Sequence, residues 1–416
     1  MTNTLYIAIT TVGFYIVLLI PLHTLADADM NKNNNISLDF AIKTTIQQNY
    51  TLKTIKEKVK IAHEELRSIP LLSNPEVDTE FIGGLHGEQN VEVTKSIELG
   101  GQRRHRKQIA MINLQIAEHQ LTLERQRIIR SVKLAFYQLL SLQEKLKLVE
   151  EMIQHNQQIY EMAQFRHEAG DISITQVGLA NLQLQSANRE FTTLKNKQQL
   201  AQLDLNGLMG TSLTNSPVVI GKLQLTYSPD YKLDTLKSQA FIHRIELKSL
   251  KLQKQLTENV HKLAKAANIP ELSIGGIVER NSDETGFGLK LSLPLPIFDR
   301  NRTGINVSKA QIKADDAQIS ELRTKISRDV ISAFLSLDAA ERNLKFYEND
   351  LLKLLNDNLN LTRSAYELGE TGLLELIFIQ NEYIKSKMDY LDTLYTYQKA
   401  YLDLEMAIGT SPESIQ

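Results

Sequence analysis

Few residues of this chain are grouped in a way that supports catalysis. The sequence contains no Gly-x-Ser-x-Gly motif, no glycine-rich phosphate loop followed by Lys and Ser or Thr, and no His-Glu-x-x-His. Nucleophilic, phosphoryl-transfer and metallohydrolase sites depend on such patterns. Cysteine is absent, so disulfides, thiolate metal sites and a lipid-bearing N-terminal cysteine are excluded. We therefore expect neither an enzyme nor a bound cofactor.

The histidines do not form a metal site either. Zinc sites place their ligands at short, regular spacings, whereas these histidines are scattered. They include His86, His105, His155, His167, His243 and His261. We interpret them as surface or interhelical residues, and only His86, in a presumed outer loop, merits a direct test.

The residues best placed for function lie in two glycine turns. Gly170-Asp171-Ile172-Ser173 and Gly369-Glu370-Thr371-Gly372 each follow a long helical pattern. Glycine readily adopts the left-handed torsions that end a helix, and the residues after it can cap the next one. Any helical hairpin needs such a turn, so these residues alone favour a structural role.

The segments around these turns occur twice. Leu38-Asp39 is matched by Leu233-Asp234 about 195 positions later, and Leu203-Asp204-Leu205 by Leu402-Asp403-Leu404 about 199 positions later. The difference indicates a few extra residues in one loop. We predict two structural repeats, residues 29–230 and 231–416, each built as helix, β-hairpin, long helix and helix.

Long helices dominate both repeats. Apolar residues at helical spacing predict helices over 38–67, 102–168 and 173–206, and over 233–266, 302–368 and 373–408. At a rise of about 1.5 Å per residue, the helix over 102–168 would be about 100 Å long, which is too long for a compact domain. The first and third helices together match the middle one in length and could stack end to end as its antiparallel partner.

Between the first and second helices of each repeat, the apolar period changes to two. Strands are predicted over 76–82 and 91–97, and over 271–278 and 287–293, as two hairpins with one apolar and one polar face. Their length suits a bilayer, but four strands cannot close a barrel and an open edge in lipid is unsatisfied. Several chains must then share one barrel. The alternative is a scaffold outside the membrane with soluble β-caps.

The N-terminal segment and the net charge limit the compartments and partners that are expected. The apolar run from Leu5 to Leu22, followed by Ala26-Asp27-Ala28, predicts a signal peptide over residues 1–28, although Met1 to Thr4 carries no Lys or Arg. A retained anchor is the alternative. The net charge of -2 lacks the basic excess that nucleic acid binding requires, so no nucleic acid partner is expected.

The repeated plan and the turn glycines Gly170 and Gly369 resemble the TolC family of outer-membrane efflux proteins. Three segments are more specific: Asn74-Pro75-Glu76, Ser-Ile-Glu-Leu-Gly-Gly-Gln-Arg at 96–103 and Pro-Leu-Pro-Ile-Phe-Asp-Arg-Asn-Arg at 294–302. They are similar to the cobalt-zinc-cadmium resistance branch of that family.

This resemblance implies a mainly α fold with a small β part, in which three chains form a twelve-stranded outer-membrane barrel continued by a periplasmic helical tunnel. The implied function is the exit duct of a tripartite efflux system for heavy-metal cations. Its partners would be two further copies, outer-membrane lipid, a periplasmic adaptor and an inner-membrane pump of the resistance-nodulation-division type. The same channel type serving drug efflux or type I secretion stays open.

The resemblance also implies roles for particular residues. By this resemblance, the periplasmic tip that docks the adaptor is formed by Gly170, Asp171, Ser173, Gly369 and Glu370.

The resemblance also implies a tunnel constriction formed by Tyr366 and Glu375, in which three copies of Glu375 form a negative ring. Thr371 replaces an arginine and Phe378 a second acid of the drug-efflux relatives, so the closing network is incomplete. A solvated surface glutamate is the alternative for Glu375.

Overall fold

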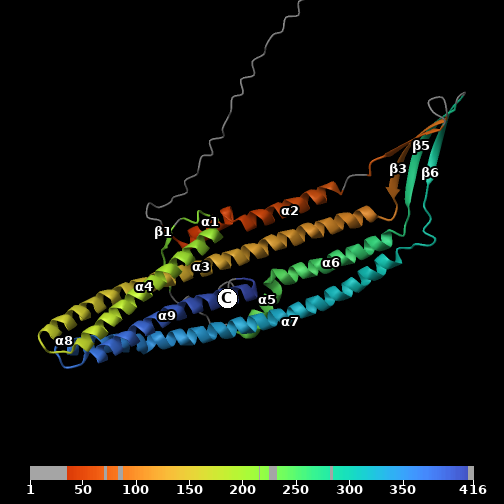
Figure 1. Cartoon of the computed structure of the whole chain (residues 1–416). Coiled ribbons are helices and arrows are strands. Elements are labelled where there is room, and N and C mark those ends of the chain that lie inside the picture. The colour runs from red at the N-terminus through yellow and green to blue at the C-terminus, as the bar shows by residue number, and fades with distance from the viewer. Residues whose placement is uncertain are drawn as a thin grey trace, which may run out of the picture.

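The computed structural model describes residues 35–69, 73–82, 88–214, 216–223, 232–281 and 284–410, with only the backbone of residues 349 and 350. The predicted signal peptide, the predicted repeat boundary at 230 and 231, and His86 lie outside the described residues. Figure 1 shows long helices side by side in an elongated body, with a sheet at one end and two helical turns at the other.

The elements follow the same order twice. The first series is α1 (Leu38–Gln48), α2 (Tyr50–Ser68), β2 (Glu76–Ile82), β3 (Glu88–Glu98), α3 (Gln102–Glu168) and α4 (Ile174–Met209). The second series is α5 (Leu233–His243), α6 (Ile245–Ala266), β5 (Glu271–Arg280), β6 (Thr285–Ser292), α7 (Arg302–Phe346), the π-helix η1 (Tyr347–Leu351), α8 (Leu352–Glu367) and α9 (Leu373–Ile408). The short strands β1 (Asn35–Ile36) and β4 (Val218–Val219), which the sequence did not predict, pair in parallel.

The helices predicted as continuous over 38–67 and 233–266 are each broken, so that prediction was wrong. The breaks lie at Asn49 and Arg244, where the backbone leaves the helical region. Asn49 caps α2 by accepting a hydrogen bond from the N–H of Leu52 at 3.1 Å, and its amide donates to the carbonyl of Leu208 at 2.8 Å. Each break therefore meets the end of the last helix in its own repeat.

The long helix predicted over 302–368 is also interrupted, because η1 separates α7 from α8. A π-helix widens the turn and changes the direction of the side chains beyond it. The first repeat has no counterpart, since α3 is an uninterrupted α-helix of 67 residues. The two repeats therefore differ between their middle and their tip.

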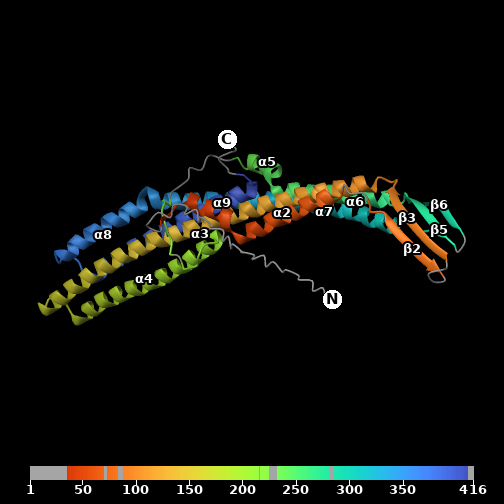
Figure 2. The same ribbon diagram turned by 90° about the horizontal axis from the view of Figure 1, so that it is seen from above.

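The two hairpins form one antiparallel sheet in the order β2-β3-β5-β6. The central pairing of β3 with β5 runs from Gln89 opposite Arg280 to Glu98 opposite Glu271. Within the described residues, β2 and β6 each have a partner on one side only. Figure 2 shows that the sheet curves away from the line of the helices.

The helices continue the order of the strands. Close to the sheet, α2, α3, α6 and α7 are neighbours in that sequence, and towards the far end α4 packs on α3, α3 on α9, and α9 on α8. The buried side chains form two clusters in the middle of the body and a third near the turns. The molecule is therefore a curved wall with two free edges.

Among the described residues, no helix combines the length and the apolar character needed to cross a bilayer.

Candidate functional sites: the two sheet faces and the helical turns

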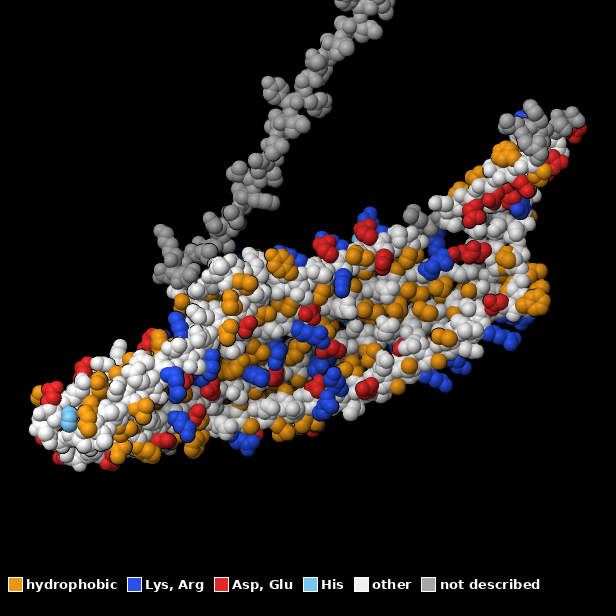
Figure 3. All heavy atoms as spheres, in the orientation of Figure 1, with side chains coloured by type: hydrophobic (Ala, Val, Ile, Leu, Met, Phe, Trp, Pro, Cys, Tyr) orange, Lys and Arg blue, Asp and Glu red, His pale blue; other side chains and the backbone are white. Residues whose placement is uncertain are grey.

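The register of the sheet separates its side chains into a polar and an apolar face. Three acids of β2, three of β3 and two of β5 share the polar face, which makes eight carboxylates among the described strand residues. They are Glu76, Asp78, Glu80, Glu88, Glu92, Glu98, Glu271 and Glu279. Figure 3 shows part of this acidic area on the projecting sheet. Such a surface attracts cations and repels anions.

Only one basic side chain of the described strands lies on this face. Lys290 on β6 forms an ion pair with Glu92 on β3, with Nζ and Oε2 separated by 2.6 Å. Glu92 is buried while the other carboxylates are exposed or half-buried. The pair therefore neutralises the carboxylate that would cost most to leave alone. Glu98 is also paired, with Arg106 at the start of α3, and the remaining six carboxylates are exposed to solutes.

The opposite face is mainly apolar and exposed, with Lys95 and Arg280 as its basic side chains among the described strands. Its side chains include Val77, Phe81, Val91, Val93, Ile97, Ile274, Val278, Phe287, Leu289 and Leu291. Leu289 is 90% exposed in a single chain. A contiguous patch of this kind marks a surface that is covered by protein or lipid.

The first turn joins α3 to α4. Gly170 has a φ of +86°, and the N–H of Asp171 donates to the carbonyl of Arg166 at 2.9 Å, which closes the end of α3. Ser173 is the N-cap residue of α4, but its hydroxyl contacts that of Thr175 at 2.6 Å instead of a backbone N–H. Gly170, Asp171 and Ser173 are all exposed.

The second turn joins α8 to α9 in the same way. Gly369 has a φ of +77°, and the N–H of Glu370 donates to the carbonyl of Ala365 at 2.8 Å. Both residues are exposed. A Cβ added to either turn glycine would meet nothing within 4 Å. In a single chain the backbone torsion, rather than crowding, is what calls for glycine at both positions.

Tyr366 and Glu375 lie in different surroundings. The Tyr366 side chain is 3% exposed and packs within the third hydrophobic cluster, where its hydroxyl has no hydrogen-bond partner among the described residues. Burial raises the pKa of Tyr366, and the nearby Arg166 guanidinium opposes that rise. Glu375 is exposed on α9 and accepts a hydrogen bond from the hydroxyl of Thr371.

Arg166 links the two turns, and the sequence analysis missed it. Its guanidinium lies 4.9 Å from the centre of the Tyr366 ring and donates to the carbonyls of Tyr366 at 3.0 Å and Glu367 at 3.2 Å. A cation at the C-terminus of α8 is favourable because carbonyl groups there carry partial negative charge. The available signal was only a basic residue in the last turn of a helix.

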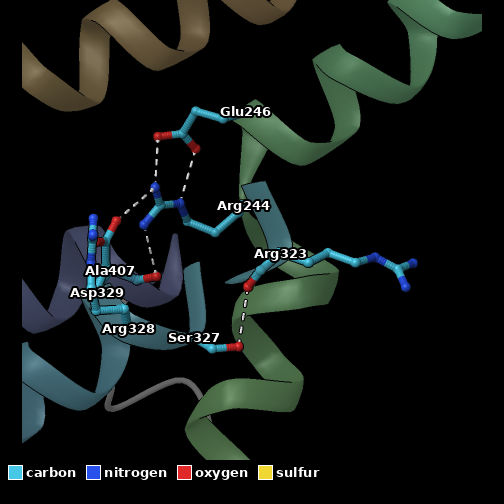
Figure 4. A network of polar contacts seen from close by, with 7 residues as sticks. All are labelled: Arg244, Glu246, Arg323, Ser327, Arg328, Asp329 and Ala407. Carbon is cyan, nitrogen blue, oxygen red and sulfur yellow. Dashed lines mark hydrogen bonds and ion pairs between the residues drawn. The ribbon is translucent and has the colours of Figure 1, made fainter. Parts of the chain in front are cut away.

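A second polar network lies at the break before α6 (Figure 4). The guanidinium of Arg244 donates to Glu246 at 3.1 and 3.2 Å and to the carbonyl of Ala407 at 3.1 Å, and it lies 3.9 Å from Asp329. The Arg244 side chain is 9% exposed. This network ties α6 and α7 to the end of α9.

The histidines that the structure describes form no metal site. In the described part of the chain, no three His, Asp or Glu side chains are grouped so that they could hold an ion. His261 contacts the Ser308 hydroxyl at 2.8 Å, and His167 contacts the carbonyl of Ile172 at 2.9 Å across the first turn. Both have structural partners.

A wall of long helices that carries a strip of sheet with one apolar and one acidic face is the protomer of a membrane channel. The chain belongs to the family described as "Outer membrane efflux protein", whose model matches residues 88–211 and 236–410. The chain is therefore an outer-membrane efflux channel with a long periplasmic extension, and the predicted family, fold class, location and absence of enzymatic function are confirmed.

Curated relatives agree with this assignment. The chain is 24% identical over 377 residues to the cobalt-zinc-cadmium resistance protein CzcC of Cupriavidus metallidurans, which covers 88% of each chain. It is 19% identical over 325 residues to the pyoverdine export outer membrane protein OpmQ of Pseudomonas aeruginosa, which covers 75% of this chain and 65% of that protein.

Solved structures share the fold. A crystal structure of CusC has a TM-score of 0.76 at 16% identity and covers 90% of this chain and 92% of its own. The outer membrane protein VceC of Vibrio cholerae has a TM-score of 0.73 at 15% identity, with 90% and 96% covered.

Proposed function

We propose that three copies of this chain form the outer-membrane exit duct of a tripartite efflux system that exports heavy-metal cations. The acidic face of the sheet carries this proposal. When three sheets close into one barrel, the apolar faces meet lipid and the polar faces line the water-filled interior. The interior then holds an excess of carboxylates over lysines, which favours the passage of cations.

The cargo is supported by likeness as well as by charge. CzcC is named for cobalt, zinc and cadmium resistance, and it matches most of this chain. The scarcity of tight ligands in the described residues agrees with an exit duct, because strong binding would slow release. A periplasmic adaptor and an inner-membrane pump complete the path to the outside.

We further propose that both turns dock the adaptor, through Gly170, Asp171 and Ser173 on one and Gly369 and Glu370 on the other. Their exposure and their position at the end farthest from the sheet support this role. We propose Glu375 as the residue that forms the tunnel constriction, with Tyr366 holding its turn in place from the buried side. The exposed carboxylate of Glu375 can face its own copies, whereas the buried ring of Tyr366 supports the backbone that carries it.

Metal tolerance tests the cargo. We expect deletion of the gene to sensitise cells to zinc, cobalt, cadmium, copper or silver salts, and the wild-type chain to restore tolerance. Unchanged metal tolerance together with altered drug tolerance would assign the channel to drug efflux instead.

Ion selectivity tests the acidic face. In planar bilayers with a salt gradient, the reversal potential of the wild-type channel should have the sign of cation preference. Replacing Glu76, Asp78 and Glu80 by their amides should shift it towards zero. The matched control, Glu57→Gln/Glu64→Gln/Glu65→Gln on α2, should leave it unchanged, and an equal shift in both variants would contradict the proposal.

A further inference from the structure

The connection between β6 and α7 is longer than its counterpart. It spans nine residues, 293–301, whereas the connection between β3 and α3 spans three, 99–101. The longer connection lies between the segments matched about 195 positions apart and those matched about 199 positions apart, where the sequence predicts extra residues. The longer connection carries the apolar motif of Leu293, Leu295, Ile297 and Phe298 beyond the edge of the sheet.

The apolar row of β6 continues into this connection. Leu289 and Leu291 lie on the apolar face of the sheet, and Leu293 follows at the same alternation. Ile297 is exposed, and Phe298 is 99% exposed. Figure 3 shows hydrophobic side chains gathered where the sheet meets the helices. The apolar surface therefore extends from the sheet to the start of the helical body.

The connection passes a groove and is then tied to the body of the chain. Pro294, Leu295 and Pro296 line a groove of about 680 Å³ together with Ser96 and Glu271. At its end, the amide of Asn301 donates to the carbonyl of Ala264 at 2.9 Å. Ile297 and Phe298 lie between the groove and Asn301 and do not line the groove.

The two prolines argue against cover by a strand of a second copy. Proline has no N–H to donate, so Pro294 and Pro296 disfavour a continued β-ladder, and β6 ends at Ser292. The neighbouring copy can pair with β6 itself, whereas pairing over the connection would lack these two donors. The apolar side chains beyond Ser292 are then left for lipid.

The charges that follow fit a lipid headgroup. Arg300 and Arg302 are exposed directly after the apolar motif. The intervening Asp299 is engaged locally, because its Oδ1 accepts the N–H of Asn301 at 2.8 Å. Aromatic side chains form girdles at the interfaces of outer-membrane barrels, and basic residues beside them attract phosphate groups.

We propose that Leu293, Ile297 and Phe298 form an interfacial anchor that inserts into the inner leaflet of the outer membrane, with Arg300 and Arg302 at the phospholipid phosphates. Three copies would place a ring of such anchors at the base of the barrel. The inference rests on the proposed trimeric channel, whose sheets cross the outer membrane. The anchor places the inner boundary of the outer membrane at the junction of the sheet and the helices.

The composition of the chain makes a direct test possible, because it contains no tryptophan. Phe298→Trp introduces a single fluorophore at the anchor. Leu289→Trp places one on the apolar face of the sheet, and Phe378→Trp places one at an exposed position near the tip. Each trimer is reconstituted into vesicles of equal parts phosphatidylcholine and phosphatidylglycerol, with bromine atoms either near the headgroup or near the end of the acyl chains.

We expect the tryptophan at position 298 to be quenched more strongly by shallow than by deep bromines, at a depth of about 5–10 Å below the surface. At position 289 it should be quenched by deep bromines, and at position 378 by neither. A tryptophan at 298 that neither bromine position quenches would overturn the anchor. This holds both for the red-shifted emission of a tryptophan exposed to water and for the blue-shifted emission of one buried against protein. Loss of quenching at 289 as well would instead overturn the membrane placement of the sheet.

Discussion

Two glycines show how a single torsion fixes the tip of the molecule. Gly170 and Gly369 close the ends of α3 and α8 with positive φ values, and each is followed by a backbone hydrogen bond that completes the turn. A left-handed conformation costs a residue with a Cβ roughly 1–2 kcal/mol. The strain of a substitution would act on the surface proposed to meet the adaptor.

Replacing Gly369 by alanine should therefore loosen the second turn. We expect faster hydrogen exchange at the amide of Glu370, which donates to Ala365, by about tenfold for each 1.4 kcal/mol of strain. Gly178→Ala is the matched control: Gly178 lies inside α4 and also has open space around it. It should slow exchange in α4, because alanine favours helices by about 1 kcal/mol over glycine. Equal acceleration in both variants would refute the torsional explanation.

At the scale of elements, each helix break is matched by the end of another helix. A Cβ on Gly210 would lie 2.9 Å from the carbonyl oxygen of Gln48, and one on Gly409 would lie 3.0 Å from the nitrogen of Arg244. Asn49 and Arg244 each donate to a carbonyl of the helix that ends there. The hydrogen bond that joins the break to the helix end comes from a neutral amide in the first repeat and from a guanidinium in the second.

The break held by the Arg244 guanidinium should be more sensitive to mutation than the break held by the Asn49 amide. Arg244→Met leaves Glu246 and the Ala407 carbonyl without their donor and removes the cation near Asp329, and breaking a buried pair costs roughly 3–5 kcal/mol. We expect a lower midpoint of thermal unfolding, measured by circular dichroism at matched protein concentration. Arg323→Met is the control, since its side chain points away from the network in Figure 4. Indistinguishable midpoints for the two variants would show that the network contributes little.

A tyrosine of α9, Tyr390, donates a hydrogen bond to Glu348 of the π-helix and is sensitive to pH. Burial raises the pKa of Tyr390 to about 12, with a further contribution from its hydrogen bond to Glu348 at 3.1 Å. An unfolded tyrosine ionises near pH 10, which is about its reference value. Above that pH the unfolded chain releases the proton first, so the folded state loses stability as the pH rises from about 10 to about 12.

Tyr390→Phe should remove that part of the decline. The measurement is the midpoint of urea unfolding at several pH values, compared with Tyr50→Phe, which alters an exposed tyrosine of α2. Above pH 10, we expect the unfolding midpoint of Tyr390→Phe to fall less steeply with pH than the midpoints of the wild type and of Tyr50→Phe. Parallel curves for all three proteins would contradict a raised pKa at Tyr390.

The sequence predicts what is encoded locally. The bounds of α3 and α9 follow from glycines and from uninterrupted helical periodicity, and both match the structure. The breaks at Asn49 and Arg244 were not predicted, because the helix ends that pack on them, at Gly210 and Gly409, lie more than a hundred residues away. Tertiary packing also determines the pairing of β3 with β5 and the contact of Arg166 with Tyr366.

At the scale of the whole molecule, the free edges carry matching apolar rows. On α8 and just after it, Leu354, Leu361 and Leu368 recur every seven residues and are exposed, as expected for a helix that packs on another. On α4, Ile174 and Leu182 are exposed. Counting from the tip, Leu182 lies about 12 Å along α4 and Leu361 about 9 Å along α8. The rows can therefore meet between neighbouring copies.

A disulfide should capture this contact, because the chain has no cysteine of its own. We expect Leu182→Cys/Leu361→Cys to give covalent trimers on non-reducing gels after oxidation. Leu200→Cys/Leu361→Cys is the control, with Leu200 equally exposed but about 39 Å along α4. Trimers in the control and none in the test pair would show that neighbouring copies meet in another register.

The single-sided pairing of β2 and β6 also bears on how the channel is made. A solitary chain that entered the bilayer would bring two rows of unsatisfied peptide groups with it, at several kcal/mol for each group. Integration into lipid must therefore await an encounter of all three chains. We expect the yield of mature pores to rise more steeply than in proportion to the amount of protein synthesised, and cells that make little of it to keep most of it outside the bilayer.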